Sequence, residues 1–353
     1  MIAAGIDIGT STTEVFFLKD GNPFGKIYFP TSELVNNLDW LCNELKKFKT
    51  DVIACAFGYG LPVKKLNEIT DLDIFLMTLN FDEKVFGVRE FLRYFRNKDF
   101  NMYVLPGVIH LPTVPIQRKI NKIDLGTPDK LASTALAIFE LSKHIRINKQ
   151  NFILVEAGSG FNAVIGVKGG KIVDGVGGSS GFPSLKCSGC LDGELAYILQ
   201  GFKKSLLSNS GILSFFNLND VELKKIPRRI LGWITEYILK CVKMLETTVN
   251  PNYVVVSGQL FNNSIFYKKV KTKLEKFGHK VKKLEGFGVA KQSAEGAAII
   301  ANGLAKGKYR KIVKQLRILE AKGTCLDYLS PSFKLLIKDR VQNMLNLNVD
   351  FLL

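Results

Sequence analysis

The chain has 353 residues, of which 46% are hydrophobic and 23% are charged. This composition indicates a globular protein with a full hydrophobic core, and the length favours about two domains. The longest apolar runs are too short to cross a membrane, and the N-terminus enters a strand pattern without a basic leader and cleavage site, so we expect a soluble cytoplasmic protein.

The net charge of +17 comes from lysine, which is concentrated in the second half of the chain. Lysine clusters can attract a nucleic acid, but no aromatic stacking motif or known reading module accompanies them. A solvated lysine surface is therefore the preferred interpretation, and we expect no nucleic-acid partner. The charge would still attract anionic metabolites.

In chain order, the first element is a hairpin in residues 2–18, IAAGIDIGTSTTEVFFL, whose first apolar run ends at Asp7 and whose turn contains Gly9. The backbone N–H groups of such a turn point outward and can hold an anion. A strand in residues 25–29, a helix that begins at Thr31 or Ser32, and a buried strand in residues 51–57 follow. This order, βββαβ, favours a mixed sheet with crossover helices packed on it.

The signal weakens between residues 58 and 115. We expect an amphipathic helix in residues 82–96, a strand in residues 102–105 and a proline-rich loop in residues 106–119. His110 and Arg118 lie in or beside this loop. Each could contact an anionic substrate, although a lone His or Arg in a loop is more often ordinary surface.

The next helix is predicted from Thr127 as N-cap, with Pro128 in its first position and Asp129 in its first turn. Its remainder, residues 131–141, is rich in Ala, Leu and Ile around most of its circumference, so it should be deeply buried. Asp129 could be a catalytic base, a metal-water ligand or simply a first-turn acid.

The sequence pattern of the first hairpin recurs in residues 152–168, FILVEAGSGFNAVIGVK, where Glu156 corresponds to Asp7 and Gly158 to Gly9. Residues 171–173 add a third strand, so the second half also begins with three strands. Two such turns facing each other would bind a polyphosphate, and the carboxylates behind them would hold a divalent metal with its waters.

A Gly- and Ser-rich loop in residues 174–190 can approach a ligand with its backbone. Beyond it we expect helices in residues 192–206, 228–247 and 264–277, strands in residues 253–257 and 281–284, and a small-residue helix in residues 290–304. This last helix and residues 131–141 have Ala and Gly where two backbones would come close, which predicts a hinge between two βββαβα halves. The rest is a basic amphipathic tail of helices to which we assign no function.

Several of these stretches resemble one protein superfamily. GIDIGTSTT resembles the first phosphate motif of the acetate kinases, sugar kinases, Hsp70 chaperones and actin, VEAGSGFNAVIGV the second, and VVVSGQLFNN the adenosine motif. The two Ala-rich helices resemble the connecting helices of that superfamily. Within it, DLGTPDKLASTALAI, VGGSSGFPSLK and LDGELAYIL look most like an archaeal family of predicted butyrate kinases.

The resemblance implies an α/β fold of two ribonuclease-H-like domains, each βββαβα, that close around a nucleotide cleft and bind ATP and Mg²⁺. The implied domains are residues 1–148 with the first phosphate motif, residues 149–306 with the second phosphate and adenosine motifs, and residues 307–353 as a basic helical tail. The implied activity is transfer of the γ-phosphate of ATP. A small organic acid is the best single candidate for the acceptor.

The resemblance also implies a role for individual residues. Asp7 would hold Mg²⁺ through water, assisted by Glu156, where many relatives have Asp, so that its metal contact is expected to be longer or water-mediated. The phosphates would bind to Gly9, Thr10, Ser11 and Thr12 and, from the other side, to Gly158, Ser159 and Gly160. The nucleoside would pack against Ser257, Gly258 and Gln259. Gly296 would let the last connecting helix approach the first.

The catalytic residues expected are Asp7, Asp129 and Arg118. A carboxylate acceptor is already ionised at neutral pH and needs no general base. A hydroxyl acceptor would use an acidic residue such as Asp129, whose carboxylate accepts the hydroxyl proton. An acyl kinase needs an arginine near the γ-phosphate, and Arg118 is the candidate by its position in the sequence.

Two other classes of function stay open. Cys187 and Cys190 form a CxxC motif, and the superfamily includes ATP-driven activators of acyl-CoA dehydratases that hold an iron–sulfur cluster between two subunits. One CxxC supplies two thiolates, so this alternative requires a homodimer. Two reduced loop thiols without a ligand role are the preferred interpretation. The remaining class is an ATPase switch that acts on a protein partner.

Overall fold

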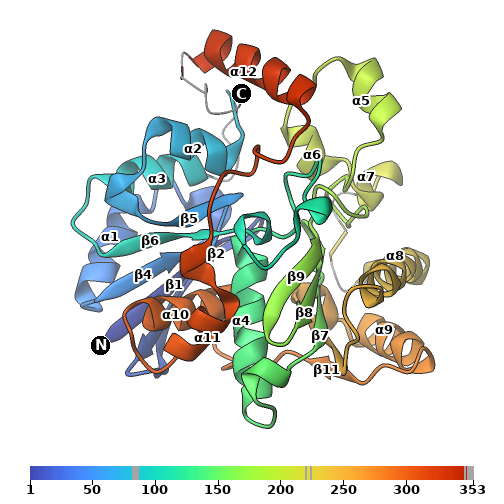
Figure 1. The fold of residues 1–353 in the computed structure, drawn as a ribbon, viewed down its shortest axis with the longest axis horizontal. Coiled ribbons are helices and arrows are strands. Elements are labelled where there is room, and N and C mark those ends of the chain that lie inside the picture. The colour runs from blue at the N-terminus through green and yellow to red at the C-terminus, as the bar shows by residue number, and fades with distance from the viewer. Residues whose placement is uncertain (82–86, 219–220, 223–224, 346, 348–353) are drawn as a thin grey trace. The chain divides into compact units, whose positions relative to one another are not determined.

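The computed structural model describes residues 1–81, 87–218, 221–222, 225–345 and 347, which form two compact units (Figure 1). The first unit contains Met1–Ile123, Thr127–Leu136 and the described part of Phe287–Leu353. The second unit contains Asp124–Gly126 and Ala137–Gly286. Helix α4 (Pro128–Ser142) contributes residues to both units.

A six-stranded mixed sheet forms the core of the first unit, in the order β3-β2-β1-β4-β6-β5. The first three strands pair antiparallel, β1, β4 and β6 run parallel, and β5 is an antiparallel edge strand. Every residue of β1 after Ile2 is buried, as expected for a central strand covered on both faces. The strands are β1 (Ile2–Ile8), β2 (Thr12–Lys19), β3 (Asn22–Pro30), β4 (Val52–Cys55), β5 (Gly60–Lys65) and β6 (Met102–Pro106).

Small residues let a helix of the first unit pack directly on its sheet. A Cβ atom on Gly5 of β1 would lie 2.2 Å from the carbonyl oxygen of Ala294 in α10, so only glycine fits there. The Ala and Ile side chains of α10 are fully buried, which confirms the predicted small-residue helix. The other helices of this unit are α1 (Leu38–Lys47), α2 (Asp71–Thr78), α3 (Val88–Arg96), α11 (Arg310–Leu316) and α12 (Pro331–Leu345), and α10 itself is Gln292–Leu304.

The part of α4 that belongs to the first unit packs against α10. A Cβ atom on Gly296 would lie only 1.9 Å from the carbonyl oxygen of Ala132. Residues Leu131 and Ala135 to Ile138 of α4 have no exposed surface, so its predicted deep burial is confirmed. The close approach that we expected of the two small-residue helices is therefore present.

The second unit repeats the topology of the first. Its sheet has the order β11-β10-β7-β8-β9, in which β7, β8 and β9 pair antiparallel and β7, β10 and β11 run parallel. The order β3-β2-β1-β4 thus recurs as β9-β8-β7-β10, and the predicted fold of two ribonuclease-H-like α/β domains is confirmed. The strands are β7 (Phe152–Glu156), β8 (Ala163–Lys168), β9 (Lys171–Val176), β10 (Tyr253–Ser257) and β11 (Val281–Lys283), and the helices are α5 (Gly193–Leu199), α6 (Ser205–Asn209), α7 (Ile212–Phe215), α8 (Arg228–Glu246) and α9 (Ser264–Lys276).

Two predicted helices differ from the structure. The helix expected from Thr31 starts at Leu38 and is preceded by a 3₁₀ turn, Thr31–Glu33, so the N-cap assignment was wrong. The helix expected in residues 192–206 is broken after α5, because Gln200 and Gly201 have φ angles of 47° and 123° that a continuous α-helix cannot contain. The sequence patterns also missed β5 and α2. Residues 82–86 of the helix expected in residues 82–96 lie outside the described residues.

The described part of residues 307–353 packs with the first unit. The Tyr309 hydroxyl donates a hydrogen bond to the carbonyl oxygen of Gly21 (2.6 Å), and the N–H of Asn121 donates to that of Tyr328 (2.9 Å). The predicted domain boundaries at residues 148 and 306 follow the sequence repeat and stay a prediction, because packing does not measure which segments fold independently. Within the described residues, no helix has both the length and the apolar character needed to cross a membrane.

Candidate functional site

The turn between β1 and β2 is held by its own backbone and by Thr31. The N–H of Gly9 donates to the carbonyl oxygen of Thr12 (3.1 Å), which places Thr10 and Ser11 at the tip. The Thr31 hydroxyl donates to the carbonyl oxygen of Gly9 (2.7 Å), and the Thr31 N–H donates to that of Ser11 (3.1 Å). Thr31 therefore orders the first turn instead of capping a helix.

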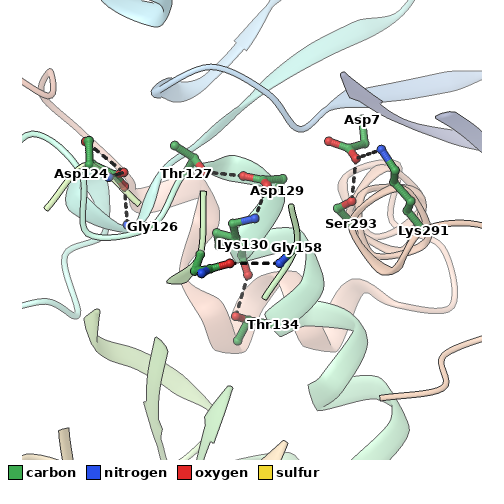
Figure 2. A network of polar contacts seen from close by, with 12 residues as sticks. Asp7, Asp124, Gly126, Thr127, Asp129, Lys130, Thr134, Gly158, Lys291 and Ser293 are labelled. Carbon is green, nitrogen blue, oxygen red and sulfur yellow. Dashed lines mark hydrogen bonds and ion pairs between the residues drawn. The ribbon is translucent and has the colours of Figure 1, made fainter. Parts of the chain in front are cut away.

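Asp7 lies beside this turn near the end of β1 and is only 4% exposed. Its Oδ2 accepts a hydrogen bond from the Ser293 hydroxyl (2.9 Å) and lies 3.5 Å from Nζ of Lys291 (Figure 2). Burial raises the pKa of Asp7 to about 6; Lys291 opposes this rise, and the negative charge of Asp129 adds to it. Burial disfavours the ionised form of a carboxylate, and a nearby cation favours it. A further cation beside Asp7 would therefore stabilise its charge.

Lys291 and Ser293 are functional candidates that the sequence patterns missed. Lys291 directly precedes α10, and its Nζ also donates to the carbonyl oxygen of Thr12 (2.6 Å). Ser293 lies in the first turn of α10 and is 6% exposed. The available signal was a lysine and a hydroxyl at the start of a helix rich in Ala and Gly.

Asp129 occupies the first turn of α4, as predicted, and forms an ion pair there. Its Oδ2 lies 2.7 Å from Nζ of Lys130, and it accepts a hydrogen bond from the Thr127 hydroxyl (Figure 2). Burial raises the pKa of Asp129, but Lys130 and Thr127 outweigh burial and hold it below its usual value. Asp129 is therefore ionised at neutral pH. The charges of both Asp129 and Lys130 shift the pKa of Asp7, so these groups form one electrostatic cluster within the first unit.

In the second unit, the turn between β7 and β8 leaves space in front of its backbone. The N–H of Gly158 donates to Oδ1 of Asn162 (3.0 Å). A Cβ atom on Gly158 would meet no heavy atom within 4 Å. Ser159 and Gly160 lie in the same turn, and the carbonyl oxygen of Ser159 accepts a hydrogen bond from the N–H of Lys186 (3.0 Å).

The predicted adenosine turn lies next to this second turn. Ser257 pairs with Glu156 in the sheet, and its N-terminal neighbours are buried. Gly258 has a φ of 100°, and a Cβ atom there would lie 2.4 Å from the carbonyl oxygen of Ala157. Glycine is thus required by both conformation and space. Gln259 is exposed and begins a 3₁₀ turn, Gln259–Asn262, whose Leu260 and Phe261 are buried.

The two predicted metal carboxylates, Asp7 and Glu156, lie one in each unit, and Glu156 is the last, partly buried residue of β7. Among the residues that the structure describes, no group of three or more His, Cys, Asp or Glu side chains could hold a metal ion. Mg²⁺ keeps several waters and commonly binds through one or two carboxylates and substrate phosphates. The assignment of Asp7 and Glu156 to a Mg²⁺ site stays a prediction.

The loop of residues 106–119 holds its two candidates, His110 and Arg118, in different surroundings. His110 is buried, and its Nδ1 accepts a hydrogen bond from the Gly107 N–H (3.1 Å). Burial lowers the pKa of His110 to about 4, so at neutral pH it carries no charge for an anionic substrate. Arg118 ends the 3₁₀ turn Ile116–Arg118 and is partly exposed. The main charges that act on Asp7 come from Lys291, Asp129 and Lys130.

The two cysteines of the CxxC motif have different environments. Cys187 is fully buried, and its Sγ donates to the carbonyl oxygen of Ser208 (3.8 Å). Cys190 is exposed, and its N–H donates to the carbonyl oxygen of Gly181 (2.7 Å). These contacts are those of a structured loop, and they do not favour the iron–sulfur alternative.

The second unit also contains a cavity of about 470 Å³. Its aromatic lining includes Phe215, Phe216, Trp233 and Tyr237. Glu236 and Lys240, which form an exposed ion pair (2.7 Å), also line it. None of the predicted site residues lines this cavity.

The solved structures that share the fold include three kinases. A propionate kinase from Francisella tularensis is 14% identical, with a TM-score of 0.60 over 83% of this chain and 98% of that one. An acetate kinase from Entamoeba histolytica is 14% identical, with a TM-score of 0.55 over 78% and 87%. A candidate N-acetylmannosamine kinase from Listeria monocytogenes is also 14% identical, with a TM-score of 0.51 over 84% and 97%. At such identities the likeness shows the fold.

No curated protein matches the sequence. The match to a family model is extensive and covers residues 5–331. The chain therefore belongs to the family described as "Protein of unknown function (DUF1464)".

Proposed function

We propose that the chain is a cytoplasmic, ATP-dependent phosphotransferase that transfers the γ-phosphate of ATP to a small organic acid, as the resemblance to predicted butyrate kinases implies. The observation that carries this proposal is the cluster around Asp7. A buried carboxylate lies against a Gly- and hydroxyl-rich turn, with two ammonium groups and a second carboxylate in electrostatic range. Phosphoryl transfer depends on such positioned charge and needs little covalent chemistry.

Each predicted residue has a proposed role in this reaction. The phosphates bind to the two turns, Gly9, Thr10, Ser11 and Thr12 in the first and Gly158, Ser159 and Gly160 in the second. Ser257, Gly258 and Gln259 back the nucleoside. Asp7 and Glu156 would hold Mg²⁺ through water, and the metal would supply charge that neutralises the transferring phosphate. Gly296 contributes indirectly by bringing α10 to α4.

Positive charge near the transferred phosphate is proposed to come from lysine. Arg118 stays a candidate by sequence position, but Lys130 and Lys291 are the cations beside the two carboxylates. Ammonium groups held in a buried setting stabilise developing negative charge more strongly than they do in water. In this proposal Lys130 and Lys291 supply positive charge of the kind that we also expected of Arg118.

Formation of an acyl phosphate tests this proposal. The purified protein is incubated with Mg-ATP and a panel of short carboxylic acids in the presence of hydroxylamine, which converts any acyl phosphate into a hydroxamate. We expect hydroxamate that depends on one class of acid, in step with release of ADP. ATP turnover that no acid affects would contradict the organic-acid acceptor.

Asp129→Asn distinguishes a carboxylate acceptor from a hydroxyl acceptor. An organic acid is already ionised, so we expect kcat to fall less than about tenfold, whereas loss of a general base costs about 10²- to 10⁴-fold. The measurement is kcat for the acid found in the hydroxamate assay, with Asp99→Asn as an exposed control. A fall in kcat of more than about 10²-fold would favour a hydroxyl acceptor.

A further inference from the structure

The ammonium group of Lys291 covers the first turn. Its Nζ donates to the carbonyl oxygen of Thr12 (2.6 Å) and lies 3.5 Å from Oδ2 of Asp7. It also lies only 2.7 Å from the place that a Cβ atom on Gly9 would occupy. Figure 2 shows the side chain reaching from the start of α10 to the carboxylate of Asp7. The glycine thus leaves room for a cation against the turn.

The backbone around Lys291 is fixed by two carboxylates. Its own N–H donates to Oε2 of Glu14 (2.8 Å), on the strand that follows the turn. Glu295 is fully buried and accepts hydrogen bonds from the N–H groups of Phe287, Val289 and Ala290 (2.8, 2.8 and 2.9 Å). Such charge-assisted bonds hold the preceding loop in one conformation. Only the flexible side chain of Lys291 is then left to move.

The carboxylates and ammonium groups of the cluster around Asp7 balance in charge. Within the cluster, each of Asp7 and Asp129 has an ammonium group beside it, Lys291 and Lys130 respectively. When a divalent metal arrives at Asp7, it repels the ammonium of Lys291. The phosphate oxygens that accompany the metal are negatively charged and attract the same group.

We propose that Lys291 is a resident counter-ion of the phosphate site: it neutralises Asp7 in the empty protein and moves onto the phosphate oxygens when ATP binds. This inference rests on the proposed function and assigns a phosphate-binding residue that none of the sequence motifs contains. It follows that Lys291 matters most for ATP without metal, because Mg²⁺ otherwise supplies part of the same charge.

The test measures ATP binding by isothermal titration calorimetry, in EDTA and in excess Mg²⁺, with adenosine as a probe that lacks phosphate. We expect Lys291→Met to weaken ATP binding about 10- to 100-fold in EDTA, the effect of one lost hydrogen bond to a charged group. In Mg²⁺ the loss should shrink to less than about threefold, and adenosine binding should not change. Lys291→Arg keeps the charge and should restore most of the affinity in EDTA. Lys311→Met, in an exposed lysine of α11, is the matched control.

The outcomes separate this inference from the proposed function. Equal ATP affinity of wild type and Lys291→Met in EDTA would overturn the counter-ion role alone. An equal loss with and without Mg²⁺, or a loss that extends to adenosine, would also overturn it, because that result indicates a structural role. A folded wild type that binds no ATP under either condition would overturn the nucleotide site itself.

Discussion

Replacing Asp7 by Asn is expected to lower ATP turnover about 10²- to 10³-fold, the usual effect of removing one preorganised electrostatic group. The amide keeps the shape of the side chain and can still accept the hydrogen bond from Ser293. It carries no charge to hold Mg²⁺ and its waters. The measurement is the steady-state release of ADP, with Asp99→Asn as an exposed control.

The same substitution should not destabilise the fold. The folded-state pKa of Asp7 is about 6, against an ordinary value of 3.8. A raised carboxyl pKa stabilises the folded protein at low pH, and this contribution is lost as the pH rises from about 4 through about 6. Two pKa units correspond to about 3 kcal/mol, so at pH 7.5 the Asn variant should match the wild type or exceed it by up to about this amount.

Urea unfolding at pH 4.5 and pH 7.5 measures this difference. The advantage of Asp7→Asn in the free energy of unfolding should be larger at pH 7.5 than at pH 4.5, as expected when a functional group is held at a cost in stability. Undiminished ATP turnover by the folded variant would remove Asp7 from the site. An unfolding free energy well below that of the wild type at pH 7.5 would contradict the raised pKa.

Gly296→Ala is expected to destabilise the first unit by about 3 kcal/mol, near the upper range for overpacking a core. The added Cβ atom would lie 1.9 Å from the carbonyl oxygen of Ala132. This neighbour is helix backbone and cannot move aside as a side chain could, so α10 and α4 must separate. Urea unfolding at neutral pH measures the effect.

Gly158→Ala is the matched control for this substitution. Its new Cβ atom would meet no heavy atom within 4 Å, so its free energy of unfolding should stay within about 0.5 kcal/mol of the wild type. If phosphates approach this turn as proposed, ATP binding should nevertheless weaken. Equal stability of the two variants would mean that the close contact between Gly296 and Ala132 does not form in solution.

The repeated hairpins made the fold class predictable, because strand alternation and glycine turns are local properties of the chain. The patterns around Asp7 and Glu156 identified the turns that follow β1 and β7, and they predicted two halves that each begin with three strands. The spatial order β3-β2-β1-β4 and its repeat came from the structure. The prediction failed where distant contacts decide the local conformation. Thr31 is a residue type that often caps helices. In the structure, however, its hydroxyl donates to the carbonyl oxygen of Gly9, 22 positions earlier in the sequence.

The sequence by itself determined which residues carry negative charge at the first turn and at the start of α4, because Asp7 and Asp129 stand in recognisable local patterns. Only the tertiary structure decided that Lys291 lies beside Asp7. Lys291 is 284 positions from Asp7 along the chain, and it reaches Asp7 because α10 packs directly on β1 through Gly5. A lysine before a helix has no local pattern that distinguishes it from the many lysines of the surface. Its role arises from close packing of backbones, which periodicity and turn chemistry do not encode.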